Sequence, residues 1–214
     1  MTDLQEYAAT YYDFSRPTDG VKHRVDSWRD WVIRRQIRSR LPRRSRRRLL
    51  DVGCGLGLFL ESMSDEFDLW GLDVSEYAIA HCRQRLPDAT FDCGSLSDGV
   101  GFSVKFDVVT AINVFEHLHD PARAADAVRR RMTTGGLLIT HLPTIGNRLQ
   151  RALYRGSYDQ DPTHIYRPSG AAFTELISAA GFTCVASAYA PFVPMPVLRR
   201  APAHPAFLAV FEAA

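Results

Sequence analysis

The stretch Leu49-Leu50-Asp51-Val52-Gly53-Cys54-Gly55-Leu56-Gly57 is the most informative part of this 214-residue chain. An apolar run ends in an acid, and the acid opens a glycine-rich turn. Glycine allows a tight backbone turn and lets a ligand approach the main chain closely. The residues Leu58-Phe59-Leu60 then predict the start of a helix, whose first N–H groups can hold a polar ligand. The sequence therefore predicts a strand–loop–helix unit that binds a cofactor.

The spacing of the glycines separates two classes of cofactor. A dinucleotide fingerprint reads Gly-x-Gly-x-x-Gly, but Leu58 stands where its third glycine would be. Asp51 precedes the first glycine, and a carboxylate there suits an ammonium group better than a pyrophosphate. An NAD-dependent oxidoreductase is therefore disfavoured. The stretch resembles D-x-G-C-G-x-G, the first motif of class I S-adenosylmethionine-dependent methyltransferases. The resemblance implies that S-adenosylmethionine, whose product is S-adenosylhomocysteine, binds at Asp51, Gly53, Cys54, Gly55 and Gly57.

A second acid follows about twenty residues later, at the end of the apolar run Leu69-Trp70-Gly71-Leu72-Asp73-Val74. A carboxylate at the tip of the second strand can accept hydrogen bonds from both ribose hydroxyls. Asp73 is therefore the ribose candidate, with Val74 beside it. Ser75 predicts the N-cap of the next helix, which Pro87 ends.

Two further segments extend the resemblance. Residues 89–96 read as a third strand and its exit loop, where the family usually has an acid that contacts adenine. This chain has Ser95 instead, so we expect backbone groups of Gly94, Ser95 and Leu96 to meet the adenine. Residues 106–113 resemble the family's fourth strand, and Asn113 at its end is expected near the methionine part of the cofactor.

The rest of the chain predicts the closing half of the fold. Asp120 and Pro121 predict the N-cap and first residue of a helix. A fifth strand is expected over 134–140, a helix over 169–180, and two last strands over 183–190 and 206–211. The resemblance implies an α/β fold: a Rossmann-like, doubly wound seven-stranded sheet with a C-terminal antiparallel hairpin and helices on both faces. We expect this methyltransferase domain over 45–214, preceded by an N-terminal helical arm or lid over 1–44.

Two segments are expected to cover the acceptor. The first is the aromatic N-terminal arm, with Tyr11 and Tyr12 as acceptor-binding candidates. The second is an acceptor-lid insertion at about 141–168, because a connection of that length in a compact domain is usually functional. It contributes Tyr158 and Tyr166 as binding candidates. His164 is the first candidate for a general base and His141 the second, since histidine titrates near neutral pH.

The segment Asn113-Val114-Phe115-Glu116-His117 raises the question of a metal. Asn113, Glu116 and His117 have the i, i+3, i+4 spacing of one helix face. The pattern resembles a metal-associated Glu-x-x-Glu-His in some relatives, including ubiquinone-pathway O-methyltransferases. Asparagine is a poorer ligand than a carboxylate. We therefore expect no metal site.

Composition limits the remaining possibilities. The chain is 46% hydrophobic, which suits one α/β domain. Its polar N-terminus does not read as a signal peptide, and no apolar run has the length of a membrane span, so we expect a cytoplasmic protein without a membrane partner. The four cysteines lack C-x-x-C spacing, which argues against zinc and disulfides. The net charge is +2, and the arginines between Arg34 and Arg48 are expected on a solvated surface rather than on nucleic acid.

The sequence therefore predicts a methyltransferase that acts on a small-molecule acceptor. We expect an O-methyltransferase of secondary or sugar-related metabolism. N- or C-methylation of a natural product stays open, as does a non-catalytic subunit with the same fold. The intact Asp51, glycines and Asp73 argue against the non-catalytic alternative. Acceptor identity and oligomeric state are left open.

Overall fold

A computed structural model describes residues 20–41, 46–98, 100–189 and 203–214. Seven strands form one sheet in the order β3-β2-β1-β4-β5-β7-β6. β1, β2, β3, β4 and β5 pair in parallel, and β7 runs antiparallel to both β5 and β6. This confirms the predicted Rossmann-like sheet with its antiparallel C-terminal pair. The strands are β1 Arg47–Val52, β2 Phe67–Asp73, β3 Thr90–Cys93, β4 Phe106–Ile112, β5 Met132–Pro143, β6 Phe182–Tyr189 and β7 Ala206–Ala213.

Local signals account for the helix boundaries. The predicted N-caps at Ser75 and Asp120 are confirmed, because each side chain accepts a backbone N–H of the first turn. Ser169 caps its helix in the same way. The helices are α2 Gly20–Arg40, α3 Leu58–Glu61, α4 Glu76–Arg85, α5 Pro121–Arg130, α6 Arg148–Ser157 and α7 Gly170–Ala179, with 3₁₀ turns η2 Leu96–Asp98, η3 Phe115–His117 and η4 Tyr158–Gln160. Among these described helices, none has the length and apolar character needed to cross a membrane.

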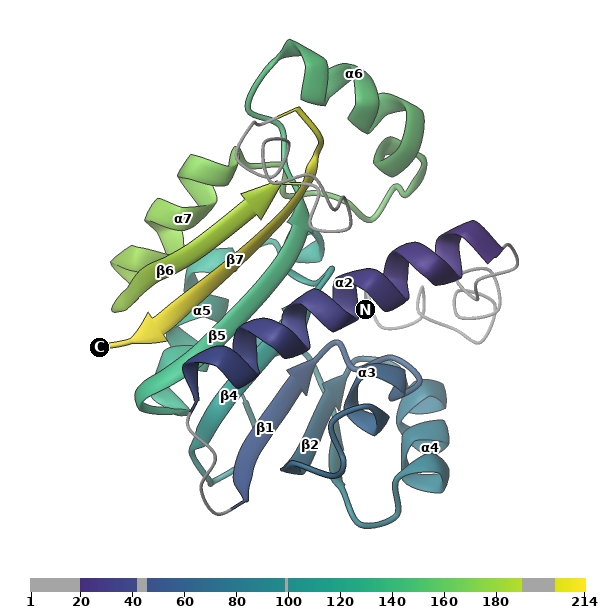
Figure 1. The fold of residues 1–214 in the computed structure, drawn as a ribbon, viewed down its shortest axis with the longest axis vertical. Helices are drawn as coiled ribbons and strands as arrows, with labels where there is room; N and C mark the ends of the chain where they lie inside the picture. Colours follow the sequence, from purple (N-terminus) through teal and green to yellow (C-terminus); the bar gives the residue numbers. More distant parts are fainter. Residues whose placement is uncertain (1–19, 42–45, 99, 190–202) are drawn as a thin grey trace.

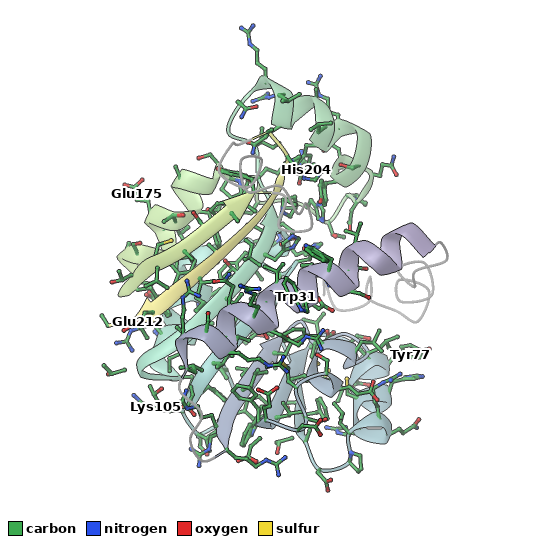
Figure 2. All side chains as sticks on the ribbon, in the orientation of Figure 1. Trp31, Tyr77, Lys105, Glu175, His204 and Glu212 are labelled. Atoms are coloured by element: carbon green, nitrogen blue, oxygen red, sulfur yellow. The ribbon has the colours of Figure 1, made fainter. Side chains whose placement is uncertain are left out.

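The sheet is buried on both faces, which explains its continuous apolar strands. Successive residues of a strand point to opposite faces. Leu50 accordingly joins the core with α5 and α7, whereas Leu49 joins the core with α2, α3 and α4. α2 crosses one face of the sheet in Figure 1, and side chains fill the space between the layers in Figure 2. The helices therefore cover both faces, as predicted.

α2 is the described part of the segment expected to form an N-terminal arm. Its residues Val32, Ile33 and Ile37 are buried in the core shared with α3 and α4. The helix is thus anchored at its centre and C-terminal half. Tyr11 and Tyr12 lie outside the described residues.

The expected insertion between β5 and α7 is largely regular structure. α6 begins at its N-cap Asn147, continues into η4, and lies beyond the end of β5 in Figure 1. Tyr154 of α6 is buried. Residues 161–168, which contain a turn at 162–163 and no helix or strand, then return to α7.

Candidate active site

The glycine loop after β1 has a shape that requires glycine. Gly53, Gly55 and Gly57 have φ values of 69°, 51° and 77°, all in the left-handed region. A Cβ on Gly53 would lie 2.5 Å from Cγ2 of Val114, which follows β4. The loop therefore packs directly against the segment that leaves β4.

The loop amides have partners within the protein. Gly53 and Cys54 both donate to the carbonyl of Leu72, at 2.7 and 3.2 Å, and Gly55 donates to Oδ2 of Asp73 at 2.8 Å. These three loop amides are therefore engaged within the protein. They fasten the loop to β2, and α3 has only four residues. The loop contributes its shape more than its donors.

The predicted cofactor residue Cys54 packs inside the protein. Its side chain is buried, and Sγ lies 4.0 Å from Sγ of Cys82 in α4. The Cys82 thiol and burial both raise the pKa of Cys54 well above its usual value. A thiol with a raised pKa is a poor nucleophile. Cys54 therefore stabilises the loop by packing against Cys82 of α4.

Asp73 lies where three segments meet. Its Oδ1 accepts from the N–H of Ser75 at 2.9 Å, its Oδ2 accepts from Gly55, and its carbonyl accepts from the N–H of Gly94. The structure thus brings the ribose candidate together with the loop and with the exit of β3. Leu96 packs in the core, so its backbone is the part that could meet a ligand.

Asp51 is a buried carboxylate at the end of β1. It is 3% exposed, and its Oδ1 accepts a hydrogen bond of 2.6 Å from the Thr110 hydroxyl of β4. Burial raises the pKa of Asp51 to about 7, although the Thr110 bond lowers it. A cation would hold such a carboxylate in its charged form. The site therefore fits the ammonium group of S-adenosylmethionine.

α2 supplies a charged group that the sequence analysis missed. Arg29 forms ion pairs of 2.9 Å with Asp26 and with Asp30. Its charge lowers the pKa of both Asp51 and His141, while the charge of Asp30 raises that of Asp51. The charge of Arg29 thus acts on titratable groups at the ends of β1 and β5. The i, i+3 spacing of Asp26 and Arg29 was its only sequence signal.

His141 and Asn113 form a mutual pair at the ends of β5 and β4. Nδ1 of His141 lies 2.7 Å from Oδ1 of Asn113, and the Asn113 N–H donates to the His141 carbonyl at 2.7 Å. Since an amide oxygen only accepts, Nδ1 carries the proton. Burial lowers the pKa of His141 to about 3. His141 is thus neutral, and its buried Nε2 has no partner among the described residues.

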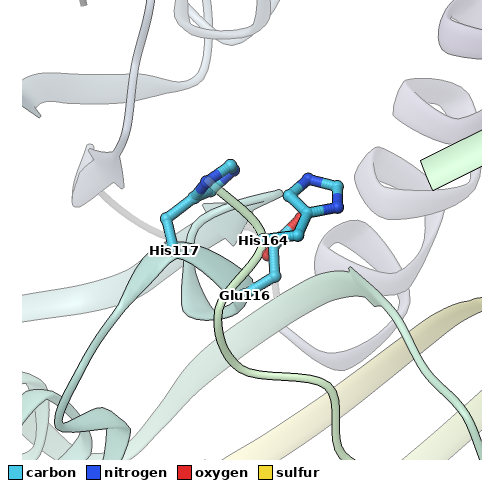
Figure 3. Close-up of side chains that lie close together, drawn as sticks. All are labelled: Glu116, His117 and His164. Carbon is cyan, nitrogen blue, oxygen red and sulfur yellow. The ribbon is translucent and has the colours of Figure 1, made fainter. Parts of the chain in front are cut away.

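Glu116 and His117 of η3 meet His164 of the segment 161–168. One ligand-type atom from each residue lies within 4.8 Å of the other two. Figure 3 shows the three side chains close together. The backbone N–H groups of Ile165 and Tyr166 both donate to the Glu116 carbonyl at 2.9 Å, which holds the segment in place. We call these three side chains the Glu116–His117–His164 cluster.

The expectation that Asn113, Glu116 and His117 share a helix face is wrong. Asn113 has a positive φ of 55°, and the chain then enters a 3₁₀ turn instead of an α-helix. Asn113 consequently turns to His141. His164 lies beside Glu116 and His117, and no local spacing could have indicated this.

The cluster is largely withdrawn from water. Burial raises the pKa of Glu116 to about 8, lowers that of His117 to about 4, and lowers that of His164. Neutral imidazoles are the result. The Tyr158 ring lies 6.3 Å from the His164 ring, whereas Tyr166 packs against the core shared with α5 and α7. Of the expected acceptor-binding tyrosines that the structure describes, Tyr158 is the one whose ring lies beside His164.

Comparison with known proteins assigns the family. A profile described as a methyltransferase domain matches residues 19–187. The chain belongs to this family. The match confirms the resemblance to class I S-adenosylmethionine-dependent methyltransferases, and with it the cofactor, S-adenosylmethionine.

Individual methyltransferases resemble parts of the chain. It is 35% identical over 107 residues to dTDP-3-amino-3,4,6-trideoxy-alpha-D-glucopyranose N,N-dimethyltransferase of Streptomyces venezuelae, covering 48% of this chain and 44% of that protein. It is 34% identical over 101 residues to the ubiquinone biosynthesis O-methyltransferase of Alkalilimnicola ehrlichii, covering 44% and 40%. The match thus spans less than half of each relative.

A solved methyltransferase has the same fold over its whole length. The S-adenosylmethionine-dependent methyltransferase of Clostridium acetobutylicum superposes with a TM-score of 0.71 and 12% identity, covering 100% of both chains.

Proposed function

We propose that this methyltransferase transfers a methyl group from S-adenosylmethionine to a hydroxyl group of a small-molecule acceptor, in secondary or sugar-related metabolism. The bound cofactor supplies an electrophilic methyl group on a sulfonium. The observation that carries the proposal is the cluster of Glu116, His117 and His164. It provides neutral imidazoles beside Tyr158, near the segment that contacts the glycine loop.

The two acids at the strand ends would hold the cofactor. Asp51 would pair with its ammonium group, and Asp73 would accept from its ribose hydroxyls. Each carboxylate oxygen can accept more than one hydrogen bond, so the backbone partners of Asp73 leave this role open. Backbone groups of Gly94, Ser95 and Leu96 would meet the adenine. Asn113, held by His141, would lie near the methionine part.

The protein's main chemical contribution would be positioning. A methyl group that leaves a sulfonium takes part in a displacement whose rate depends on the alignment of acceptor and donor. An acceptor hydroxyl also has to lose its proton, which calls for a base. His164 is our first candidate because it is neutral and lies beside Tyr158. His141 is the second, since its Nε2 is unprotonated.

N-methylation of an amine is the second candidate function. One relative is named for an amino sugar and another for O-methylation in ubiquinone biosynthesis. A neutral amine already carries a lone pair and needs no strong base. The buried cluster of titratable groups favours oxygen. A non-catalytic role is disfavoured because the two acids and the glycine loop that would bind the cofactor are intact. Both acids are also held in place by hydrogen bonds.

Binding and transfer can be tested separately. S-adenosylhomocysteine at about 100 times its dissociation constant should stabilise the protein by about 2.7 kcal/mol, and NAD should not. Transfer is then followed with a labelled methyl donor and paired panels of hydroxyl and amine acceptors. Hydroxyl acceptors should be labelled. A shift with NAD alone would overturn the family-based cofactor assignment for this chain, and labelling of amines alone would overturn O-methylation.

The His164→Ala variant tests the role of the cluster. It should lower turnover by about 10²- to 10⁴-fold, the usual contribution of a general base, while the affinity for S-adenosylhomocysteine stays the same. The matched control is His119→Ala, because His119 is an exposed histidine two residues from the cluster. Equal turnover in both variants would contradict a role for His164.

A further inference from the structure

We propose that Glu116, His117 and His164 form a binding site for one divalent transition-metal ion, with Zn²⁺ as the best fit. The sequence predicted no metal site. The position of His164 reverses that expectation, because it adds a third ligand that the local sequence pattern does not contain. In relatives with the metal-associated pattern, a glutamate stands at the position of Asn113. In this chain Asn113 bonds to His141 instead.

The donor set and its spacing suit this class of ion. Two imidazoles and one carboxylate form a known set of ligands for Zn²⁺. Their ligand atoms lie within 4.8 Å of one another. Donors around a tetrahedral Zn²⁺ are separated by about 3.4 Å, so side-chain rotations that bring these atoms up to about 1.4 Å closer together would complete the site. Mg²⁺ and Ca²⁺ prefer all-oxygen ligands and fit less well.

The carboxylate of Glu116 indicates that a partner belongs in the cluster. Glu116 is 0% exposed, and neither Oε1 nor Oε2 has a hydrogen-bond partner among the described residues. Buried polar atoms are nearly always bonded, and each exception calls for an explanation such as an ion. A cation between Glu116 and the imidazoles would satisfy these oxygens.

Both imidazoles are oriented in the way that metal-binding histidines usually are. Nδ1 of His117 lies 2.8 Å from the Thr163 hydroxyl, and Nδ1 of His164 lies 3.2 Å from the Tyr154 hydroxyl. A second hydrogen bond of this kind sets the direction of the ring and strengthens it as a ligand. The rings are therefore already held in place from outside the cluster.

The charge of the surroundings matches a divalent ion. Besides Glu116, Asp161 places Oδ2 3.7 Å from Nε2 of His164, and its Oδ1 accepts from the Thr163 N–H. Once a bound cation holds Glu116 in its charged form, two carboxylates with two neutral imidazoles sum to two negative charges. The positive charge of Arg167 lowers the pKa of His164, and this guanidinium already forms an ion pair of 2.9 Å with Asp159.

The metal site would also define the acceptor, and this step rests on the proposed methyl transfer. An acceptor with two neighbouring oxygens, such as a vicinal diol or a hydroxyl beside a carbonyl, could bind the ion through both. The bound hydroxyl would release its proton to water. Its oxygen would then bond to the methyl carbon as the carbon–sulfur bond breaks, leaving a neutral thioether. In a metal-loaded site His164 would therefore act as a metal ligand, and not as the general base.

The test measures metal binding without a methyl donor. Protein stripped with a chelator is titrated calorimetrically with ZnCl₂, and with MgCl₂ for comparison. We expect one Zn²⁺ per chain and much weaker Mg²⁺ binding. Glu116→Gln and His164→Ala should each raise the dissociation constant for Zn²⁺. The rise should exceed the roughly 10- to 100-fold loss of metal affinity that follows removal of a residue that only hydrogen-bonds to a ligand. His119→Ala is the control and should bind like the wild type. Co²⁺ should give the visible absorption of a low-symmetry nitrogen–oxygen site, which Glu116→Gln should abolish.

Two outcomes would overturn the proposal. In the first, the wild-type protein does not bind Zn²⁺ stoichiometrically. In the second, the Glu116→Gln variant binds Zn²⁺ as tightly as the wild type does. If Glu116→Gln does not fold, His117→Ala replaces a less buried ligand and serves the same purpose. Because S-adenosylhomocysteine affinity is measured on the same samples, loss of the metal site and failure of the methyltransferase assignment give different results.

Discussion

The carboxylate of Asp73 accepts a hydrogen bond of 2.8 Å from the backbone N–H of Gly55. The residue expected to hold the ribose therefore also holds the glycine loop. The same carboxylate accepts from Ser75, which caps α4. Its negative charge thus stabilises two neighbouring backbone segments, as well as any ribose that binds there.

Replacing this charge should weaken cofactor binding. In Asp73→Asn the amide can accept fewer hydrogen bonds, and charge-assisted bonds contribute about 1.5–3 kcal/mol each. We expect the dissociation constant for S-adenosylhomocysteine to rise by about 10- to 100-fold, measured by calorimetry. Asp68→Asn, at the other end of β2, is the control and should bind normally. Unchanged affinity in Asp73→Asn would refute the ribose role.

Two glycines with similar φ values separate backbone strain from close packing. Gly53 has φ 69° and Gly135 has φ 75°, but only at Gly53 would a Cβ meet a neighbour, Val114, within 4 Å. Gly135→Ala should lower the free energy of unfolding by about 1–2 kcal/mol through strain alone. Gly53→Ala should cost about 1–3 kcal/mol more through overpacking and should also weaken cofactor binding. Equal losses in chemical denaturation would contradict the close approach.

Asp51 should make the free protein less stable as pH rises. Its pKa of about 7 in the folded state exceeds the ordinary value of 3.8. Between these values the folded protein holds a proton that the unfolded chain has released. The free energy of unfolding should therefore fall with rising pH, by up to about 1.4 kcal/mol per pH unit.

The Asp51→Asn variant checks this effect because it removes the titration. Relative to the wild type, the variant should gain stability between about pH 4 and pH 7 in denaturant titrations. It should also bind S-adenosylhomocysteine more weakly, since the ammonium group loses its charged partner. Parallel stability curves for the two proteins would show that Asp51 does not titrate in this range.

His141 should have the opposite pH dependence. Its pKa of about 3 in the folded state lies below the ordinary value of 6.5. Below about pH 6.5 the unfolded chain takes up a proton that the folded protein does not, so stability falls as the pH falls towards 3. His141→Gln should lose this acid sensitivity. If the denaturation midpoints of variant and wild type decline in parallel as the pH falls, the prediction that His141 stays neutral in the folded protein is wrong.

The predicted fold was confirmed where the signals were local. Ser75 and Asp120 were predicted as N-caps from single residues and their neighbours, and both cap their helices. The strand containing Leu49 and Leu50 was predicted from an apolar run, which is how a strand buried on both faces reads. The predicted helix at Leu58 begins there but ends after one turn.

The site was predicted less completely because its groups meet over long distances in the chain. The spacing of Asn113, Glu116 and His117 suggested one helix face. The left-handed backbone at Asn113 instead sends its side chain to His141. Asparagine is enriched in this conformation, but most asparagines do not adopt it, so the residue type alone does not predict the turn. Arg29 was missed for a similar reason, since an arginine in an N-terminal helix looks like any surface residue.

Hydrophobic periodicity, capping and glycine conformation act over a few residues. The succession of strands and helices along the chain, the glycine turn and the two acids at strand ends could therefore be predicted from local sequence. The meeting of His164 with Glu116 and His117, and the bonds from the loop amides to β2, could not. These contacts depend on how the sheet and its connections pack. Packing joins residues far apart in the chain, where no spacing rule applies.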